Sequence, residues 1–318
     1  MNLAEQIEIS CLVEATARKP GNVHPAASFV DLTYDDFVAA ARAIADQLAE
    51  ARRVGLGQAV LNAIRATRQA AGSNVNLGIA LLIAPLAAVR SGMPLSSGIC
   101  DVLARTTVED AEQVYEAIRL ARPGGLGQAE SQDVNDRPSV TLRAAMALAA
   151  DRDKIAEQYS TDFALVLGPA RSWLVDEWRR ASEIARMIPQ TNSATGGLGM
   201  PPWEAAIIRL QLRLLAHAPD SLVARKCGLA TAIELQNRAA DVCGSDWTDS
   251  RRDELPLRQF DDWLREDGHR RNPGTTADLI AATLFAAARD GLIELPARDE
   301  IAVHAARIRQ TSPKGSRS

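Results

Sequence analysis

The stretch LGIALLIAPLAAV, from Leu77 to Val89, is the longest apolar run in the chain. Its apolar residues cover nearly every face of a helix, and such a helix is buried on all sides. A bilayer requires about 20 apolar residues in a row, and this run is shorter and contains Gly78 and Pro85. We therefore expect a helix over residues 77–90 at the centre of a soluble protein.

Helical periodicity continues on both sides of this central segment. Leu3, Ile7 and Cys11 share one face of a first helix, and Thr33 is a predicted N-cap for a second. Alternating strand patterns and fixed-period repeats are not found. Further helices are predicted over residues 58–70, 109–121, 138–150, 162–188 (with a break at Gly168-Pro169 as an alternative), from 201, over 221–242, from 273 or 275 to 289, and over 298–308. The fold class is all-α, one large domain of about a dozen helices over residues 1–310, followed by a disordered tail at 311–318.

Composition narrows the classes of partner. The chain has 318 residues, 47% of them apolar and 4% aromatic, and a net charge of −4. No overall positive field exists to attract nucleic acid or an anionic membrane, so any polyanion must be held by a local cluster. The four cysteines form no CxxC pair and the N-terminus has no basic signal region. We expect reduced thiols and a cytoplasmic location; a homo-oligomer is left open.

Four loops are more polar and glycine-rich than turns require. The first, RKPGNVHP (residues 18–25), offers Lys19 to phosphate and Gly21 for close approach of the backbone; the alternative is a solvated helix C-terminus. The second, AAGSNVNLG (residues 70–78), places Asn74 and Asn76 before the central helix, as ligand-facing amides or merely as caps.

The third loop, PGGLGQAESQDVNDRP (residues 123–138), carries Glu130, Asp133 and Asp136 at every third position. Carboxylates at this spacing can hold Mg²⁺ together with water and substrate phosphate; the alternative is a solvated acidic loop. The fourth, GHRRNPGTTADL (residues 268–279), combines a helix start, capped by Asn272 or Thr275, with cations that favour an anion there. Those cations are His269, Arg270 and Arg271.

These loops, in this order, resemble the triphosphoribosyl-dephospho-CoA synthase family over roughly residues 14–292. The motifs that carry the resemblance are E-x(4)-KPGNV at residues 14–23, followed by Asp31 and Phe37, then GSNVNLG, and finally NPGTTADLIAATLF. The resemblance implies an all-helical enzyme that joins the ribose of ATP to dephospho-CoA and releases adenine. One departure is clear: the family carries Asn-Thr-His-Lys-Gly in the second loop, whereas this chain reads Asn-Val-Asn-Leu-Gly at residues 74–78.

The resemblance implies roles for named residues. Asp31 is the expected base and His24 or His269 the expected acid, because an imidazole changes charge near neutral pH. Glu130, Asp133 and Asp136 are assigned to Mg²⁺. The residues assigned to the nucleotide are Lys19, Gly21, Asn22, Asn74, Asn76, Arg270, Arg271 and Asn272.

Two other classes compete with this interpretation. The missing His and Lys favour a non-catalytic nucleotide-binding protein, or a related enzyme of another cofactor pathway, such as the synthesis of a one-carbon pterin carrier. A helical, Mg²⁺-dependent nucleotide pyrophosphohydrolase usually carries ExxE and ExxD motifs on helices. Here the carboxylates lie in a glycine-flanked loop, which disfavours that class.

Overall fold

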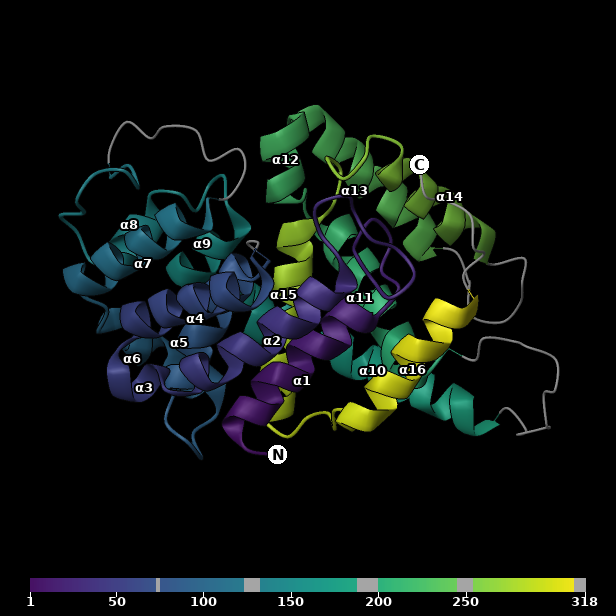
Figure 1. The fold of residues 1–318 in the computed structure, drawn as a ribbon, viewed down its shortest axis with the longest axis horizontal. Coiled ribbons are helices and arrows are strands. Elements are labelled where there is room, and N and C mark those ends of the chain that lie inside the picture. The colour runs from purple at the N-terminus through teal and green to yellow at the C-terminus, as the bar shows by residue number, and fades with distance from the viewer. Residues whose placement is uncertain (73–74, 123–131, 188–199, 245–253, 312–318) are drawn as a thin grey trace.

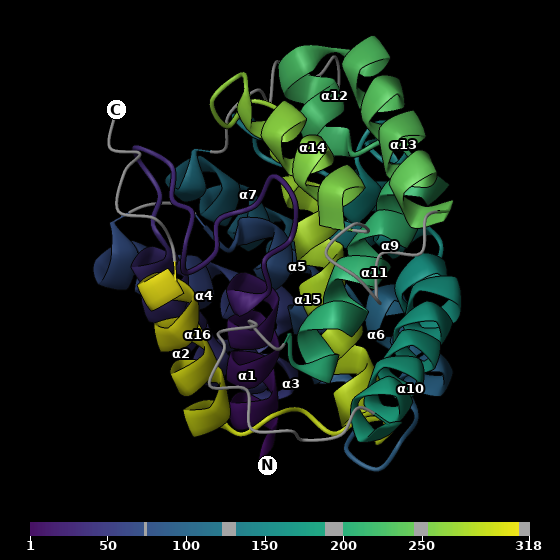
Figure 2. The ribbon, with the colours of Figure 1, turned by 90° about the vertical axis from the view of Figure 1, so that its right-hand side faces the viewer.

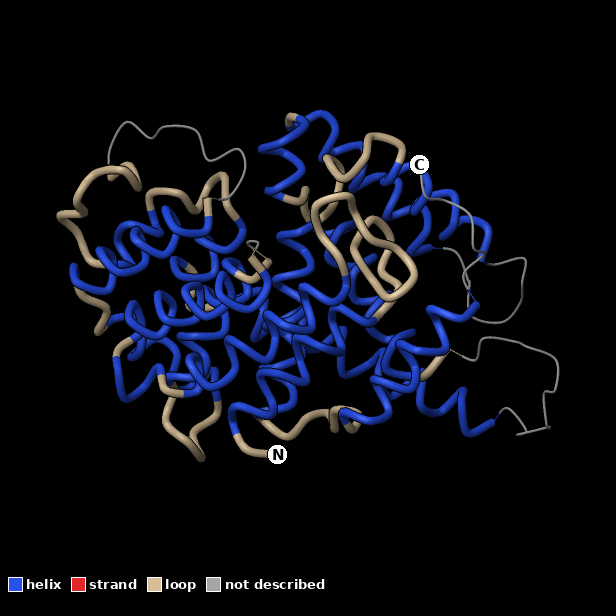
Figure 3. The backbone as a smooth tube through the Cα atoms, in the orientation of Figure 1, coloured by secondary structure: helices blue, strands red, loops and turns tan. Residues whose placement is uncertain are grey.

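A computed structural model describes residues 1–72, 75–122, 132–187, 200–244 and 254–311. In these ranges the chain forms sixteen α-helices and one π-helical turn. Extended pairing in the same ranges is limited to two isolated bridges, His24 with Ala27 and Phe29 with Leu32. The all-α prediction is confirmed (Figure 3). None of the helices described is long and apolar enough to cross a membrane.

Two helices form the centre of the molecule. These are α5 (Leu77–Ala88) and α15 (Gly274–Arg289), which pack against each other. Every residue of α5 from Gly78 to Ala87 is buried, as the apolar run predicts. The helix α1 (Leu3–Thr16) packs on α15 as well.

The other helices extend from this centre in two directions (Figures 1 and 2). On one side α2 (Tyr34–Ala49), α4 (Leu56–Ala71) and α7 (Val108–Ala121) pack one on the next. On the other, α10 (Arg171–Met187) packs on α11 (Pro202–His217), which packs on α13 (Leu229–Gly244). The remaining elements are α3 (Ala51–Val54), α6 (Leu95–Ala104), α8 (Leu142–Ala147), α9 (Lys154–Ser160), η1 (Val166–Ala170), α12 (Ser221–Cys227), α14 (Glu254–Arg265) and α16 (Arg298–Thr311).

The helix α11 joins two apolar cores. Its residues Ile207, Leu210 and Leu214 belong to the main core around α5 and α15. Its residues Ile208 and Leu212 belong to a smaller core beneath α12, α13 and α14. Because α11 buries one face in each core, it lies between the two cores and holds them together.

Several helix boundaries differ from the sequence prediction. The helix expected over residues 221–242 is two helices, because Gly228 adopts φ +90° and ends α12. The helix predicted to start at Pro138 begins instead at Leu142, with Thr141 as its N-cap. The predicted caps of α15 are wrong: Pro273 occupies the N-cap position and provides no side-chain hydrogen bond. Thr33 caps α2 as predicted, in a reciprocal box with Asp36.

Candidate active site

A cavity of about 850 Å³ lies where the N-terminal ends of α5, α9 and α12 meet the first turns of α15. All four polar loops contribute to its lining: Asn22 and Val23 from the first, Val75, Leu77 and Gly78 from the second, Gln132, Asp133 and Val134 from the third, and Asn272, Gly274, Thr275 and Asp278 from the fourth. The four loops that the sequence analysis selects as candidate binding loops therefore share one cavity. Its size is typical of a small-molecule site.

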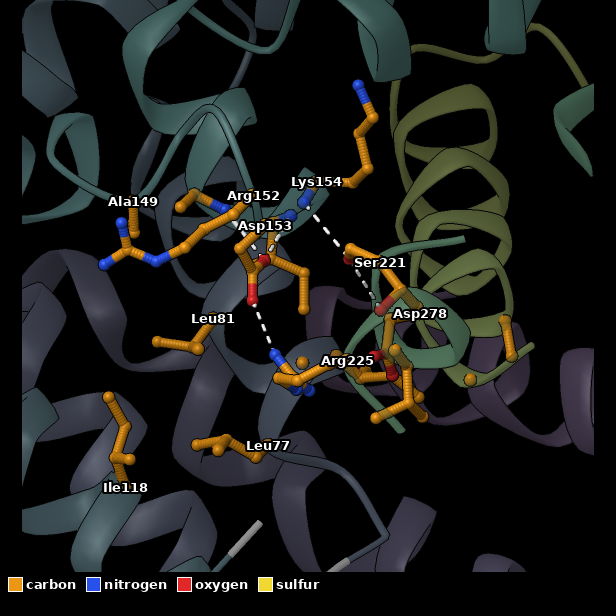
Figure 4. A pocket seen from close by; sticks show the side chains of 18 of the residues that line it. Leu77, Leu81, Ile118, Ala149, Arg152, Asp153, Lys154, Ser221, Arg225 and Asp278 are labelled. Carbon is orange, nitrogen blue, oxygen red and sulfur yellow. Dashed lines mark hydrogen bonds and ion pairs between the residues drawn. The ribbon is translucent and has the colours of Figure 1, made fainter. Parts of the chain in front are cut away.

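The cavity has an apolar side and a polar side (Figure 4). Leu77, Leu81 and Ile118 lie on the apolar side, at the ends of α5 and α7. Ser221 and Asp278 lie on the other side. Four cationic residues from the segments around α9 and α12 also line it: Arg152, Lys154, Arg225 and Lys226. Five carboxylates line the same cavity, so these cations offer local contacts to a polyanion and not a net positive field.

Two aspartates build the polar side by capping helices. Asp153 caps α9 by accepting from the backbone N–H groups of Ile155 and Ala156. Its other oxygen, Oδ2, lies 3.0 Å from Nη1 of Arg225 on α12. One carboxylate thus begins a helix and at the same time fixes a cationic side chain at the cavity.

Asp220 joins the starts of α12 and α15. It caps α12, and its Oδ2 accepts from the backbone N–H of Thr276 at 2.8 Å and from that residue's hydroxyl at 2.7 Å. Beside it, the Ser221 hydroxyl donates to Thr275 Oγ1 at 3.1 Å and accepts from the N–H of Lys154 at 3.3 Å. Burial raises the pKa of Asp220, although these hydrogen bonds act in the opposite direction.

Asp278 lies on α15 against the start of α5. A Cβ atom added to Gly78 would lie 2.0 Å from Oδ2 of Asp278, so only glycine permits this approach. Burial raises the pKa of Asp278 well above its ordinary value, and the nearby carboxylates of Glu14, Asp220 and Asp153 raise it further.

The cations of the first loop face the protein interior. Arg18 forms a two-point ion pair with buried Glu204, with Nε–Oε1 2.8 Å and Nη2–Oε2 3.0 Å. Lys19 is 0% exposed and its Nζ lies 2.9 Å from Oε1 of Glu14. Of the described residues, Glu14 lines the cavity and Lys19 does not. The phosphate role expected of Lys19 therefore has no geometric support.

Gly21 and Asn22 bind other parts of the chain. Gly21 adopts φ +74°, and a Cβ there would lie 2.8 Å from Cδ1 of Leu264, so the close approach is to α14. Asn22 Nδ2 donates to Asn272 Oδ1 at 2.6 Å, and Asn22 Oδ1 accepts from Gln211 at 2.9 Å. Asn22 and Asn272 do line the cavity, and their mutual hydrogen bond joins the first loop to the fourth.

The acid–base residues expected from the sequence lie outside the cavity lining. Burial and the nearby cations Arg265 and Lys19 lower the pKa of His24 to about 3, so it stays neutral at physiological pH and its Nδ1 accepts from the N–H of Ala26. Asp31 and His269 lie 3.8 Å apart with exposed side chains. None of the three is among the described residues at the cavity, which leaves their proposed roles without support.

The basic pair of the fourth loop also points elsewhere. Arg271 donates to the carbonyl of Trp263 at 2.7 Å and stacks over its ring at 4.6 Å. Arg270 donates to the carbonyl of Lys226 and lies 3.6 Å from Asp267. Neither is a described residue of the cavity lining. These cations stabilise the packing of α14 and the loop that follows it, which the sequence interpretation had assigned to phosphate binding.

The second-loop amides are only partly described. Asn74 lies outside the described residues. Asn76 occupies the N-cap position of α5 without a side-chain capping bond, is 1% exposed, and its Nδ2 has no partner in the part of the chain described. The N–H groups at the start of α5 are therefore not satisfied by an Asn76 cap.

The expected metal ligands do not form a described cluster. Glu130 lies outside the described residues. Asp133 lines the cavity, and its Oδ1 accepts from the N–H and side-chain amide of Asn135, whereas Asp136 is exposed and its N–H bonds to the carbonyl of Asp133. Within the described ranges no group of three His, Cys, Asp or Glu residues could hold a metal ion. Asp133 is thus the one of the three that the structure places at the cavity.

The sequence interpretation missed the cations and carboxylates around α9 and α12. Signals for part of them exist, because Asp153 and Asp220 each precede an apolar periodic run and are ordinary N-caps. Arg225 and Lys226 carry no such signal, since they read as the polar face of an amphipathic helix. Only the packing of α12 beside α9 and α15 brings them to the cavity.

Comparisons with known proteins identify the family and a shared fold. The family model described as CitG, ATP:dephospho-CoA triphosphoribosyl transferase, matches residues 1–296. A crystal structure of a "putative triphosphoribosyl-dephospho-coA synthase" from Archaeoglobus fulgidus is 22% identical, with a TM-score of 0.56, and covers 80% of this chain and 100% of its own, which shows a shared fold. Comparison with curated proteins gave no match. The chain belongs to the ATP:dephospho-CoA triphosphoribosyl transferase family.

Proposed function

We propose that the cavity at the starts of α5, α9, α12 and α15 binds ATP and transfers its triphosphoribosyl group to a hydroxyl of dephospho-CoA, releasing adenine. The activity is that of the family. The observation that supports this location is the convergence of all four family-like loops on one cavity. A second hollow, near His304, is smaller, with a volume of about 370 Å³, and none of the four loops lines it in the part of the chain described.

The triphosphate is assigned to the basic side of the cavity. Lys226 has no ion-pair partner in the described part of the chain, and Arg225 is held in place by Asp153. The start of α5 adds backbone N–H groups without a side-chain cap, which favour anions through hydrogen bonding and the helix dipole. These groups take the place of Lys19, Arg270 and Arg271 in the phosphate-binding role.

The apolar side of the cavity is assigned to an adenine ring. Leu77, Leu81 and Ile118 offer apolar contact area, and Tyr115 also lines the cavity, with its hydroxyl donating to the carbonyl of Gln132 at 2.7 Å. Apolar pockets with a few placed polar groups bind adenine-sized rings well. Both substrates of the family carry adenine, so this surface fits either of them.

Mg²⁺ fits as an ion that enters with the nucleotide. Magnesium commonly binds through one or two carboxylates together with substrate phosphates, and Asp133 is a carboxylate at the cavity. When bound, the ion would neutralise part of the triphosphate charge. Asp133 would then orient it, with its own Oδ1 fixed by Asn135.

The direct test is release of free adenine. Purified protein is incubated with ATP, Mg²⁺ and dephospho-CoA, and products are separated by chromatography and mass spectrometry. We expect equimolar adenine and a dephospho-CoA adduct that has gained the triphosphoribosyl group, with no adenine when the acceptor is omitted. Release of phosphate or pyrophosphate without adenine would contradict this function.

A non-catalytic nucleotide-binding protein is the second candidate. It is favoured by the second loop, which reads Asn-Val-Asn-Leu-Gly where family members have His and Lys. Tight ATP binding by calorimetry with no adenine for any hydroxyl acceptor would support it. The expected cytoplasmic location, lack of nucleic-acid partners and homo-oligomer stay predictions.

A further inference from the structure

We propose that Asp278 is the general base of the transfer, accepting the proton of the attacking hydroxyl. This inference rests on the proposed function and assigns the role that the sequence interpretation gave to Asp31. It depends on the position of the Asp278 carboxylate in the cavity and on its lack of partners.

Among the carboxylates that line the described part of the cavity, Asp278 alone has neither a hydrogen bond nor an ion pair. Glu14 is paired with Lys19 at 2.9 Å and Asp153 with Arg225 at 3.0 Å. Asp151 lies 3.6 Å from Arg152, and Asp133 accepts from Asn135. Because the chain already engages the other lining carboxylates, Asp278 is the one that stays available to accept from a substrate group.

The packing around Asp278 holds its carboxylate at the cavity. Gly78 at the start of α5 removes the side chain that would collide with Oδ2 at 2.0 Å. Buried Asp220 accepts from the backbone N–H and the hydroxyl of Thr276. These bonds fix the first turn of α15, which carries Asp278. The base is therefore carried by a rigid helix, as a catalytic group requires.

Most of the charged groups near Asp278 raise its pKa. Burial raises its pKa most, followed by Glu14 on α1, Asp220 before α12 and Asp153 before α9, whereas Arg225 on α12 lowers it. Cys11 on α1 is also close, and burial keeps that thiol neutral by raising its pKa. A carboxylate raised in this way is a stronger base than an ordinary aspartate, which is what proton abstraction from a hydroxyl needs.

The acceptor O–H bond breaks and its proton passes to the Asp278 carboxylate, while the oxygen electron pair forms the new bond to C1′ of the ribose. The C1′–N bond to adenine breaks, its electron pair leaves with adenine, and adenine takes a proton from water. Asp278 then returns its proton to water, so the net transfer is from hydroxyl to adenine.

Asp278→Asn is the test, read by activity, pH profile and thermal melting. The amide cannot accept the proton, so we expect kcat to fall by about 10²–10⁴-fold with ATP binding retained in calorimetry. In the wild type, kcat/KM should rise with pH as Asp278 loses its proton. The residual activity of the variant should not show this rise. The control is Asp241→Asn, which changes an exposed carboxylate on α13 and should leave all three readouts unchanged.

Thermal melting separates a catalytic role from a structural one. A raised folded-state pKa means that the ionised carboxylate destabilises the fold above that pKa, so Asp278→Asn should raise Tm at pH 8. A lower Tm would show that Asp278 is a structural acceptor, and a wild-type kcat would exclude it as the base; either result overturns the proposal while adenine release by the wild type stands. If the wild type releases no adenine, the proposed function fails first.

A second variant guards against misfolding of the first. Gly78→Ala introduces a Cβ that must displace the Asp278 carboxylate, and also meets Cδ1 of Ile155 at 2.7 Å. We expect kcat to fall at least tenfold. Gly244→Ala, where a Cβ would meet nothing within 4 Å, is the matched control, and equal activity of the two alanine variants would contradict the placement of Asp278.

Discussion

The first loop and the polar side of the cavity carry similar residues and use them differently. In the first loop, Arg18 and Lys19 are matched by the carboxylates of Glu204 and Glu14. At the cavity, Lys226 and Asp278 have no ion-pair partner in the described part of the chain, although carboxylates and cations are close by. Polar groups that the protein satisfies itself stabilise the fold, and those that it leaves unsatisfied beside a cavity are available to a ligand.

This difference is invisible at the level of residue types. RKPGNVHP looks like a phosphate loop because it has cations, a glycine and an amide, yet its groups bind α11, α14 and α1. The α12 segment ARKC looks like the end of an ordinary amphipathic helix, yet it provides Arg225 and Lys226 to the cavity. Substitutions in the two regions should therefore separate into losses of stability and losses of activity.

The largest expected effect is on the stability of the first loop. Arg18→Ala leaves Glu204, which is 0% exposed, with His304 as its remaining side-chain partner at 2.8 Å. Breaking a buried ion pair costs about 3–5 kcal/mol. We expect the free energy of unfolding, measured by urea denaturation, to fall by an amount near the lower end of that range, since Arg18 is itself 21% exposed. At low temperature kcat should be retained, and a selective loss of activity would place Arg18 in the site after all.

The second effect is the dependence of stability on pH. The pKa of His24 is lowered from 6.5 to about 3, so its contribution to stability is complete above pH 6.5 and is lost as pH falls through that window, by at most about 1.4 kcal/mol per pH unit. The pKa of Glu204 is lowered to about 2, because hydrogen bonds from His304 and Arg18 outweigh the opposing effect of burial. The contribution of Glu204 to the free energy of unfolding is therefore lost only as pH falls below 4.5.

His24→Asn tests the upper part of this window. The amide oxygen can replace Nδ1 as acceptor for the N–H of Ala26 but cannot be protonated. We expect the decline in unfolding free energy between pH 6.5 and 4.5 to become flatter than in the wild type. An imidazole resonance of His24 that titrates near neutral pH in NMR would contradict the buried, neutral histidine.

The smallest effect concerns one phosphate contact. Lys226→Ala removes a cation at the cavity and should raise KM for ATP about tenfold, which corresponds to about 1.4 kcal/mol, with Tm unchanged. Arg271→Ala is the matched control, because its guanidinium stacks on Trp263; it should lower Tm without changing KM. The reverse pattern would restore the phosphate role that the sequence suggests for Arg271.

The sequence predicts the fold better than it predicts the site, for a physical reason. Burial of α5 follows from its apolar run, and the Thr33 cap follows from local hydrogen bonding, so both are encoded within a few residues. The break between α12 and α13 depends on one residue, Gly228, whose backbone conformation depends on the packing around it. The partners of Lys19 and Asp278 are decided by which helices meet, and no local pattern in the chain contains that information.

The same limit applies to the individual side chains of the four loops. Asn22, Asp133 and Asn272 line the cavity because their loops converge there, and their binding roles stay predictions. Asp31, His24 and His269 were chosen for their chemistry near those loops, and they are not among the described residues that line the cavity. Convergence of loops was therefore predictable from the family-like motifs, whereas the direction of each side chain was not.

Backbone hydrogen exchange with and without ATP and Mg²⁺ tests the central claim most directly. If the nucleotide binds where the four loops converge, ATP should slow exchange at the starts of α5, α9, α12 and α15, residues 77–80, 154–157, 221–224 and 274–278. Exchange in the first-loop segment 18–20 and in α16 should change little. Protection confined to α16 and the start of α11, around the second hollow, would contradict the account.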